Sequence, residues 1–215
     1  MDVYLNSFVP ICANKFGRNS IISNSLPPFI DGSCRREPDF QNNFPAITQL
    51  CRPGKLVPKL KHGDLIIYIT KKGNYCNGNP HWRFIGILEV ICLCHNHFSA
   101  VNYYHNYNIP VSQNVFCVKT SPFALNMTHG ICGFKHGNLS PTRIINLWDE
   151  FYKKRSLSHG QTAITKVWKN HLYLVNPAIL TKDTMLNIFG RIPGTQNPPK
   201  LTNAEWENFK NAMNI

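Results

Sequence analysis

The chain has 215 residues, 43% of them hydrophobic and 12% aromatic, a composition that excludes an intrinsically disordered protein and allows one domain with a buried core. Lys and Arg number 23 against 11 Asp and Glu, so the formal net charge is +12. This excess favours a polyanionic partner, most often nucleic acid, although a basic surface with no partner is an open alternative.

The first half of the chain predicts strands separated by polar loops. Met1–Ala13 contains a first strand broken at Pro10, and Lys15–Pro28 is rich in Asn, Ser and Pro, which is typical of a loop. Two apolar runs follow, Leu65–Thr70 and Trp82–Leu93, both rich in β-branched and aromatic residues. Because a polar loop joins them, we expect a long hairpin that forms the centre of the domain.

The last third of the chain predicts helices. Ser140 fits an N-cap followed by Pro141 at the first helical position, and apolar residues recur at helical spacing through Lys154. Thr181–Phe189 and Thr202–Met213 are two further expected helices. The overall expectation is an α+β fold with a β-rich first two thirds and a helical C-terminal third.

Four shorter segments are less regular. We expect a short helix at Ser99–Tyr107 and a strand at Asn114–Lys119. The segments Thr162–Trp168 and His171–Val175 fit either a strand or a helix.

The central hairpin also carries a family resemblance. A Lys-x-Gly-Asp turn leads into an apolar strand that contains Tyr, and a Gly-x-x-x-Val strand returns beside it; the matching residues are Lys61, Gly63, Asp64, Tyr68, Gly86 and Val90. This pattern resembles the PUA-like superfamily, especially its EVE, YTH and ASCH branches. It is also similar to the domains found beside DNA-hypermodification enzymes in phage and bacterial gene clusters.

The resemblance implies a PUA/EVE-like mixed β-barrel with flanking helices over residues 1–125. Residues 126–215 would then be a helical C-terminal extension packed on the barrel. In EVE and YTH relatives, a pocket at one mouth of the barrel accepts a flipped, modified base. Carried over to this chain, the base pocket comprises Asn6, Ser7, Phe8, Tyr68 and Trp82. The chain departs from the YTH branch because the full set of tryptophans of the methyl-base cage is absent, which leaves the ligand open.

The segment "IDGSCRREPDF" has the strongest chemical character. Arg35 and Arg36 could grip phosphates, since guanidinium offers a planar donor fork. Asp31, Glu37 and Asp39 could orient a base edge, hold a metal or act as acid or base, and are the candidate catalytic residues. The alternative is a surface loop whose charges pair with one another.

Basic residues flank the expected hairpin and could track a nucleic-acid backbone. The basic run comprises Arg52, Lys55, Lys59, Lys61, Lys71 and Lys72. The expected phosphate contacts are Arg35, Arg36, Lys71, Lys72 and Arg83. A solvated basic face is the alternative for this run. Trp82 follows a polar loop and could stack on a base, while the alternative is a core tryptophan at the edge of the barrel.

Two clusters of Cys and His raise the possibility of zinc. Cys92-x-Cys94-His95-x-His97 and His129-x-x-Cys132-x-x-x-His136 both lack the paired spacing of tetrahedral sites, so we expect no metal. No cofactor is expected, because phosphate-loop and dinucleotide glycine motifs are absent. Cys34 could be an activated thiolate, but no signature of a cysteine hydrolase surrounds it.

The expected compartment is the cytoplasm. Met1–Pro10 lacks the pattern of a signal peptide, no run approaches ~20 apolar residues, and the eight cysteines are then expected as reduced thiols. No membrane partner is therefore expected.

Three hypotheses of function follow. The first is a binding module that recognises a modified or flipped base of nucleic acid, with DNA favoured over RNA. The second is an enzyme that acts on a nucleotide or a modified DNA base through the loop of Asp31, Glu37 and Asp39. The third is a component of a defence or modification system whose helical third docks a protein partner.

Overall fold

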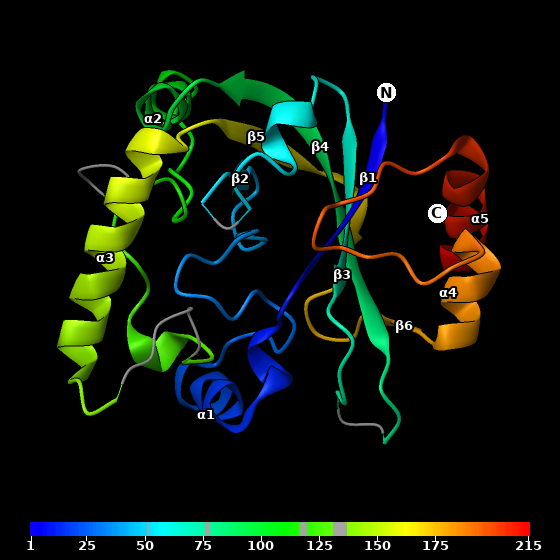
Figure 1. Ribbon diagram of the computed structural model, residues 1–215, viewed down its shortest axis with the longest axis horizontal. Helices are drawn as coiled ribbons and strands as arrows, with labels where there is room; N and C mark the ends of the chain where they lie inside the picture. The colour runs from blue at the N-terminus through cyan, green and yellow to red at the C-terminus, as the bar shows by residue number, and fades with distance from the viewer. Residues whose placement is uncertain (51, 76–77, 117–119, 131–136) are drawn as a thin grey trace.

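The computed structural model describes residues 1–215 except 51, 76–77, 117–119 and 131–136. It is an α+β protein whose sheet curls into a half-barrel, with helices on either side (Figure 1). The strands are β1 (Val3–Phe8), β2 (Ala46–Thr48), β3 (Leu65–Thr70), β4 (Trp82–Cys94), β5 (Thr162–Leu172) and β6 (Ala178–Leu180). The α-helices are α1 (Lys15–Asn24), α2 (His97–Asn106), α3 (Pro141–Ser158), α4 (Lys182–Phe189) and α5 (Asn203–Met213).

The sheet has the strand order β1-β3-β4-β5-β2, and β6 pairs with β4. β1 runs parallel to β3, whereas the other pairs are antiparallel. The outer edge of β1 is covered by the segment 199–201, where the N–H of Leu5 donates to the carbonyl of Pro199 at 3.0 Å. Covering this edge removes a site for unwanted strand pairing.

The predicted central hairpin is confirmed. β3 and β4 pair with Tyr68 opposite Gly86, and every residue of β3 is buried. A Cβ atom at Gly86 would lie 2.5 Å from the carbonyl oxygen of His171 in β5. Glycine at this position therefore lets β5 approach β4 closely.

Asp64 fastens the turn that leads into β3. Its carboxylate accepts hydrogen bonds from the backbone N–H groups of Asp2 and Lys61, each at 2.8 Å. Gly63 has a φ of 82°, in the left-handed region that favours glycine. The bond to Asp2 joins this turn to the start of β1, where β1 and β3 begin their parallel pairing.

The two faces of the sheet carry separate cores, because successive side chains of a strand point to opposite faces. One core contains Tyr4, Phe8, Phe40, Ile66, Tyr68 and Leu88. The other contains Val3, Leu5, Leu65, Ile67, Phe84, Met185 and Phe209. In Figure 1, α4 and α5 cover the second face, while α1 and α3 stand on the side of the first.

The expectation of a helical last third is wrong in part, because β5 and β6 lie within it. β5 is placed between β4 and β2, so the sheet takes strands from both sides of residue 125. The first four residues of β5, Thr162 to Thr165, are all buried. Burial on both faces removes the alternation of polar and apolar residues that distinguishes a strand in a sequence.

The loop expected at Lys15–Pro28 is also wrong, since α1 occupies most of it. Asn14 caps this helix by accepting a hydrogen bond from the N–H of Gly17 at 2.8 Å. Gly17 and Ser20 are its buried residues, and the Ser20 hydroxyl donates to the carbonyl of Thr128 at 2.8 Å. Because its buried residues are a glycine and a serine, this helix lacks the apolar stripe by which an amphipathic helix is recognised in a sequence.

The other expected helices are confirmed as α2, α3, α4 and α5. Ser140 caps α3 as predicted, and Gly190 ends α4 with a φ of 65°. Of the strand expected at Asn114–Lys119, residues 114–116 are not in a strand and 117–119 lie outside the described residues. No helix in the described part of the chain is both long and apolar enough to cross a membrane.

The pairing of β5 with β4 is interrupted near the C-terminal end of β5. Val167 pairs with Leu88 and Leu172 with Gly86, so four residues of β5 face a single residue of β4. Lys169 and Asn170, both exposed, have φ values of 48° and 64°. Positive φ at two successive positions is the pattern of a tight type I′ turn, where Gly and Asn are favoured over Lys.

We expect Lys169→Gly to raise the free energy of unfolding by about 0.5–1 kcal/mol. The left-handed conformation costs an L-residue about 1–2 kcal/mol, whereas glycine loses about 0.5–1 kcal/mol more than alanine in chain entropy. Urea denaturation measures the difference. The control is Lys166→Gly, in the extended part of β5, which should lower the stability; a Lys169→Gly protein no more stable than wild type would contradict the prediction.

Candidate functional site

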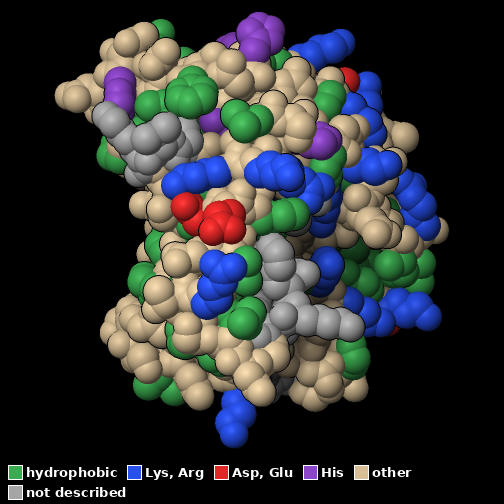
Figure 2. All heavy atoms as spheres, turned by 60° about the vertical axis from the view of Figure 1, so that its left-hand side comes forward, with side chains coloured by type: hydrophobic (Ala, Val, Ile, Leu, Met, Phe, Trp, Pro, Cys, Tyr) green, Lys and Arg blue, Asp and Glu red, His purple; other side chains and the backbone are tan. Residues whose placement is uncertain are grey.

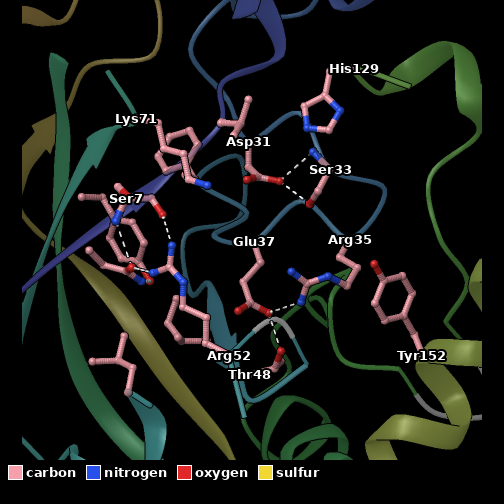
Figure 3. Close-up of a pocket in the computed structure, with 16 residues that line it drawn as sticks. Ser7, Asp31, Ser33, Arg35, Glu37, Thr48, Arg52, Lys71, His129 and Tyr152 are labelled. Carbon is pink, nitrogen blue, oxygen red and sulfur yellow. Dashed lines mark hydrogen bonds and ion pairs between the residues drawn. The ribbon is translucent and has the colours of Figure 1, made fainter. Parts of the chain in front are cut away.

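A cavity of about 280 Å³ opens on the first face of the sheet, where β1 and β3 end. Its walls come from these two strand ends, from the segment 31–37, from Ile47 and Thr48 of β2 and from Tyr152 of α3. Figure 3 shows the side chains of these segments converging on it. Since β1 and β3 are parallel, their C-terminal ends meet at the same edge of the sheet, which is a common place for a ligand.

Asn6 organises the strand side of the cavity. Its Nδ2 donates to the Tyr68 hydroxyl at 3.3 Å, and its Oδ1 accepts from the N–H of Ser7 at 2.9 Å. The Arg52 guanidinium donates to the same Oδ1 and, at 2.9 Å, to the carbonyl oxygen of Ser7. Asn6 is 7% exposed, so these bonds satisfy a polar group that has little contact with solvent.

Tyr68 forms part of an aromatic wall. Its ring lies 6.2 Å from that of Phe8 and 5.6 Å, edge to face, from that of Phe40. Burial raises the pKa of Tyr68 well above its ordinary value, with Glu37 adding to the effect. The hydroxyl therefore stays protonated at neutral pH and can both donate and accept a hydrogen bond.

Asp31 begins the opposite wall. Its Oδ1 accepts hydrogen bonds from the N–H of Ser33, at 2.8 Å, and from the Ser33 hydroxyl. Its Oδ2 has no hydrogen-bond partner among the described residues. Burial raises the pKa of Asp31, and the bonds from Ser33 and the charges of Arg35 and Arg36 oppose this only in part.

Glu37 ends the same wall and is held more strongly. Its Oε2 accepts hydrogen bonds from Arg35 Nη1 at 3.0 Å, from Asn114 Nδ2 at 3.0 Å and from the Thr48 hydroxyl. The Glu37 and Arg35 side chains are 8% and 4% exposed, so this is a buried ion pair with additional hydrogen bonds. Its Oε1 makes no hydrogen bond within the described part of the chain.

Cationic and aromatic groups complete the site. The Arg35 guanidinium lies 5.2 Å from the ring centre of Tyr152 in α3, a cation–π contact. Lys71 follows β3 and enters from the side of Ser7 (Figure 3). The cavity thus combines two carboxylates with the three cations Arg35, Arg52 and Lys71.

His129 lies at the rim next to Asp31 and Ser33 (Figure 3). Burial, together with the charge of Arg36, lowers the pKa of His129 to about 4, so its imidazole is neutral at pH 7. A Cβ atom at Gly32 would lie 2.3 Å from the His129 ring. Glycine at this position therefore allows the segment 31–37 to pack against the imidazole.

The structure brings together most of the residues that the sequence singled out. Lining the cavity are Asn6, Ser7, Phe8, Asp31, Arg35, Glu37, Tyr68 and Lys71. Their roles as base-pocket, phosphate-binding or catalytic residues stay predictions.

Five other expected site residues lie elsewhere: Trp82, Arg36, Asp39, Lys72 and Arg83. Trp82 packs in the core of the opposite face, and Lys72 lies over its ring at 5.1 Å. Trp82 and Phe84 share this orientation because they are two residues apart on β4.

The other three residues that lie outside the cavity are buried and make hydrogen bonds within the protein. Arg36 donates to the carbonyl oxygens of Asp31 and Met127 at 2.6 and 2.7 Å, so it supports the segment 31–37 from outside the cavity. Arg83 donates to His81 and to the carbonyl of Pro177, each at 2.9 Å. Asp39 accepts from the N–H of Gln41 at 3.2 Å.

Several lining residues were not predicted. Ser33, Thr48, His129 and Tyr152 reach the cavity from four separate segments, and Arg52 was expected only as part of a basic run. No local pattern marks such residues, because only the fold brings them together. Ser33 lay inside a segment already singled out and was the one most open to prediction.

The structure describes only some of the residues in the two Cys and His clusters. Cys92 and Cys94 in β4 place their sulfur atoms 3.9 Å apart, and burial, with a smaller effect of Cys92, raises the pKa of Cys94 to about 12. Cys132 and His136 lie outside the described residues. Among the residues that are described, no group of three or more His, Cys, Asp and Glu could hold a metal ion.

The raised pKa of Asp31 predicts a cost to stability. The folded protein binds this proton more tightly than the unfolded chain does, so the fold loses stability as the pH rises through the pKa. We expect Asp31→Asn to raise the melting temperature at pH 7, because an amide carries no charge to desolvate and its oxygen keeps the bonds from Ser33. The gain should shrink as the pH is lowered through the raised pKa of the folded state, and it should vanish below the unfolded value of about 3.9, where the carboxyl is protonated in both states.

Thermal unfolding followed by circular dichroism at several pH values checks this prediction. The control is Asp183→Asn, at an exposed position in the first turn of α4. This control should give no stabilisation at any pH. A melting temperature of Asp31→Asn below that of wild type at pH 7 would show that the carboxylate is favourable where it lies.

Comparisons with models of known protein families, with curated proteins and with solved structures find no match to this chain. The resemblance to the PUA-like superfamily therefore stays a prediction. The function has to be argued from the cavity and its chemistry.

Proposed function

We propose that the protein is a nucleic-acid-binding module whose cavity accepts a single base, flipped out of its stack. The observation that carries this proposal is the cavity itself, in which aromatic rings, buried carboxylates and cations converge on a volume of about 280 Å³. Ligand pockets usually measure ~300–1,000 Å³. A cavity just below this range suits one base, not a larger cofactor.

The lining offers both kinds of contact that a base requires. Phe8, Tyr68 and Tyr152 supply aromatic surface, against which a base can pack. Asn6, Asp31 and Glu37 supply polar atoms for the edge of the base, which enzymes and readers of flipped bases recognise by hydrogen bonds.

Positive charge around the cavity supports a polymer partner. Lys71 and Arg52 lie on its strand side, where they could hold the phosphates next to the flipped nucleotide. Lys and Arg outnumber Asp and Glu across the face of the molecule shown in Figure 2, in keeping with the net charge of +12. Of the base pocket expected from the PUA-like resemblance, Asn6, Ser7, Phe8 and Tyr68 line the cavity, whereas Trp82 does not.

A second candidate function is favoured by one specific observation. Asp31 and Glu37 both line the cavity, whereas Asp39 does not. Two carboxylates in one small cavity, one of them with a raised pKa, suit general acid–base chemistry on a nucleotide or a modified base.

The binding proposal predicts that two neighbouring lysines behave differently. Lys71→Gln should weaken binding to single-stranded DNA and reduce the salt dependence of log K by about 0.7, because one phosphate contact is lost. Lys72→Gln is the matched control, since Lys72 lies over Trp82 outside the cavity. Fluorescence polarisation at several salt concentrations measures both.

Two further readings of the same assay test the proposal. Plain, methylated and 5-substituted bases should differ in affinity, and that preference should persist at high salt. If all probes bind alike, all binding vanishes with salt, and the two lysine variants are equivalent, the protein only has a basic surface and the cavity is not the nucleic-acid site.

The catalytic candidate predicts a chemical change in the ligand. Nucleotides and DNA with 5-substituted bases would be incubated with the protein and their products identified by mass spectrometry. Glu37→Gln should abolish turnover, and Asp39→Asn, from the same segment but outside the cavity, should retain it. If every incubation leaves the ligand unaltered while the binding assay is positive, the catalytic candidate is wrong and the binding module is supported.

A further inference from the structure

The two carboxylates of the cavity are anchored in the same way, each through one oxygen only. Glu37 Oε2 accepts from Arg35, Thr48 and Asn114, and Asp31 Oδ1 accepts twice from Ser33. The second oxygen of each, Glu37 Oε1 and Asp31 Oδ2, has no hydrogen-bond partner in the described part of the chain. Figure 3 shows the second oxygen of Glu37 turned toward the cavity and that of Asp31 turned away from Ser33, toward the side of Lys71.

These two oxygens define what a ligand must offer. An ionised carboxylate oxygen only accepts hydrogen bonds, and Asp31 and the Glu37 side chain are 5% and 8% exposed. A ligand that fills the cavity displaces the water that these oxygens would otherwise contact. Each oxygen that then lacks an N–H or O–H donor becomes a desolvated, unpaired charge, which is costly.

We propose that the base accepted by this cavity carries an exocyclic amino group, as cytosine, adenine and guanine do. This inference rests on the proposed function. An amino group supplies two N–H donors that diverge, so it can serve both free oxygens or serve one together with a ring N–H. Uracil and thymine in a polymer have one N–H each, at N3, and their carbonyl oxygens would face a carboxylate.

The anchoring also predicts how an amide would lie in place of each carboxylate. In Glu37→Gln, the amide oxygen must take the position of Oε2, because Arg35 and Asn114 Nδ2 can only donate there. The amide nitrogen is then turned into the cavity as a donor. In Asp31→Asn, the backbone N–H of Ser33 fixes the amide oxygen in the same manner, again leaving a donor in the cavity.

The test uses single-stranded oligonucleotides in which every nucleotide but one is abasic. The one base is cytosine or uracil in the first pair of probes, and adenine or unsubstituted purine in the second. Wild-type protein should bind cytosine more tightly than uracil, and adenine more tightly than purine, by about tenfold or more in each pair, because one charge-assisted hydrogen bond is gained. Fluorescence polarisation gives the four affinities.

The variants then test which residues read the base. Glu37→Gln should reverse the order of cytosine and uracil, since its amide nitrogen can donate to the uracil carbonyl O4. Asp31→Asn provides an independent variant in case Glu37→Gln fails to fold, and it should at least abolish the cytosine preference. Asp39→Asn, from the same sequence segment but outside the cavity, should keep the wild-type preference.

The outcomes separate this inference from the proposed function. The inference is overturned if wild-type protein binds both probes of each pair with equal affinity. It is also overturned if Glu37→Gln lowers the affinity for cytosine and for uracil by the same factor. The proposed function survives either outcome if Lys71→Gln still weakens binding more than Lys72→Gln. Absence of binding to any probe, including oligonucleotides with all bases present, overturns both.

Discussion

The parallel pairing of β1 with β3 is the constraint on which the site depends, and the hydrogen bonds accepted by Asp64 establish it. One carboxylate holds the turn before β3 and the first residues of the chain together. From that point the two strands run in register, with Asn6 beside Tyr68 and Phe8 beside Thr70. Shifting the register by one residue would turn each of these side chains to the opposite face, into the core below α4 and α5.

The cavity buries two carboxylates, Asp31 and Glu37, and the protein compensates each of them differently. Glu37 is compensated by a buried cation and two neutral donors, whereas Asp31 depends on the hydrogen bonds from Ser33 and on the charges of Arg35 and Arg36. The difference explains why burial dominates the pKa of Asp31. The apolar cores on the two faces of the sheet supply the stability that allows such groups to be buried at one edge.

The sequence was informative where a local pattern survives folding. The hairpin of β3 and β4 is bounded by turns, and α3 carries its own cap, so both were predictable. α1 is anchored by polar contacts and β5 begins buried on both faces, which are features without a periodic signature. Part of the cavity was foreseeable because its residues cluster in two short segments, Asn6 to Phe8 and Asp31 to Glu37. Thr48, His129 and Tyr152 reach the cavity only because the fold brings distant segments together. The prediction for Trp82 was wrong because the face of β4 to which a side chain points depends on the register of the strand.

The division of the fold into two cores has a practical consequence for handling the molecule. The last residue, Ile215, packs against the core shared with α4 and α5, and the C-terminus lies beside those helices in Figure 1. The cavity opens on the other face of the sheet. A dye, an affinity tag or a surface linker attached at the C-terminal end thus leaves the cavity unobstructed, so immobilised protein can present this face to ligands in solution.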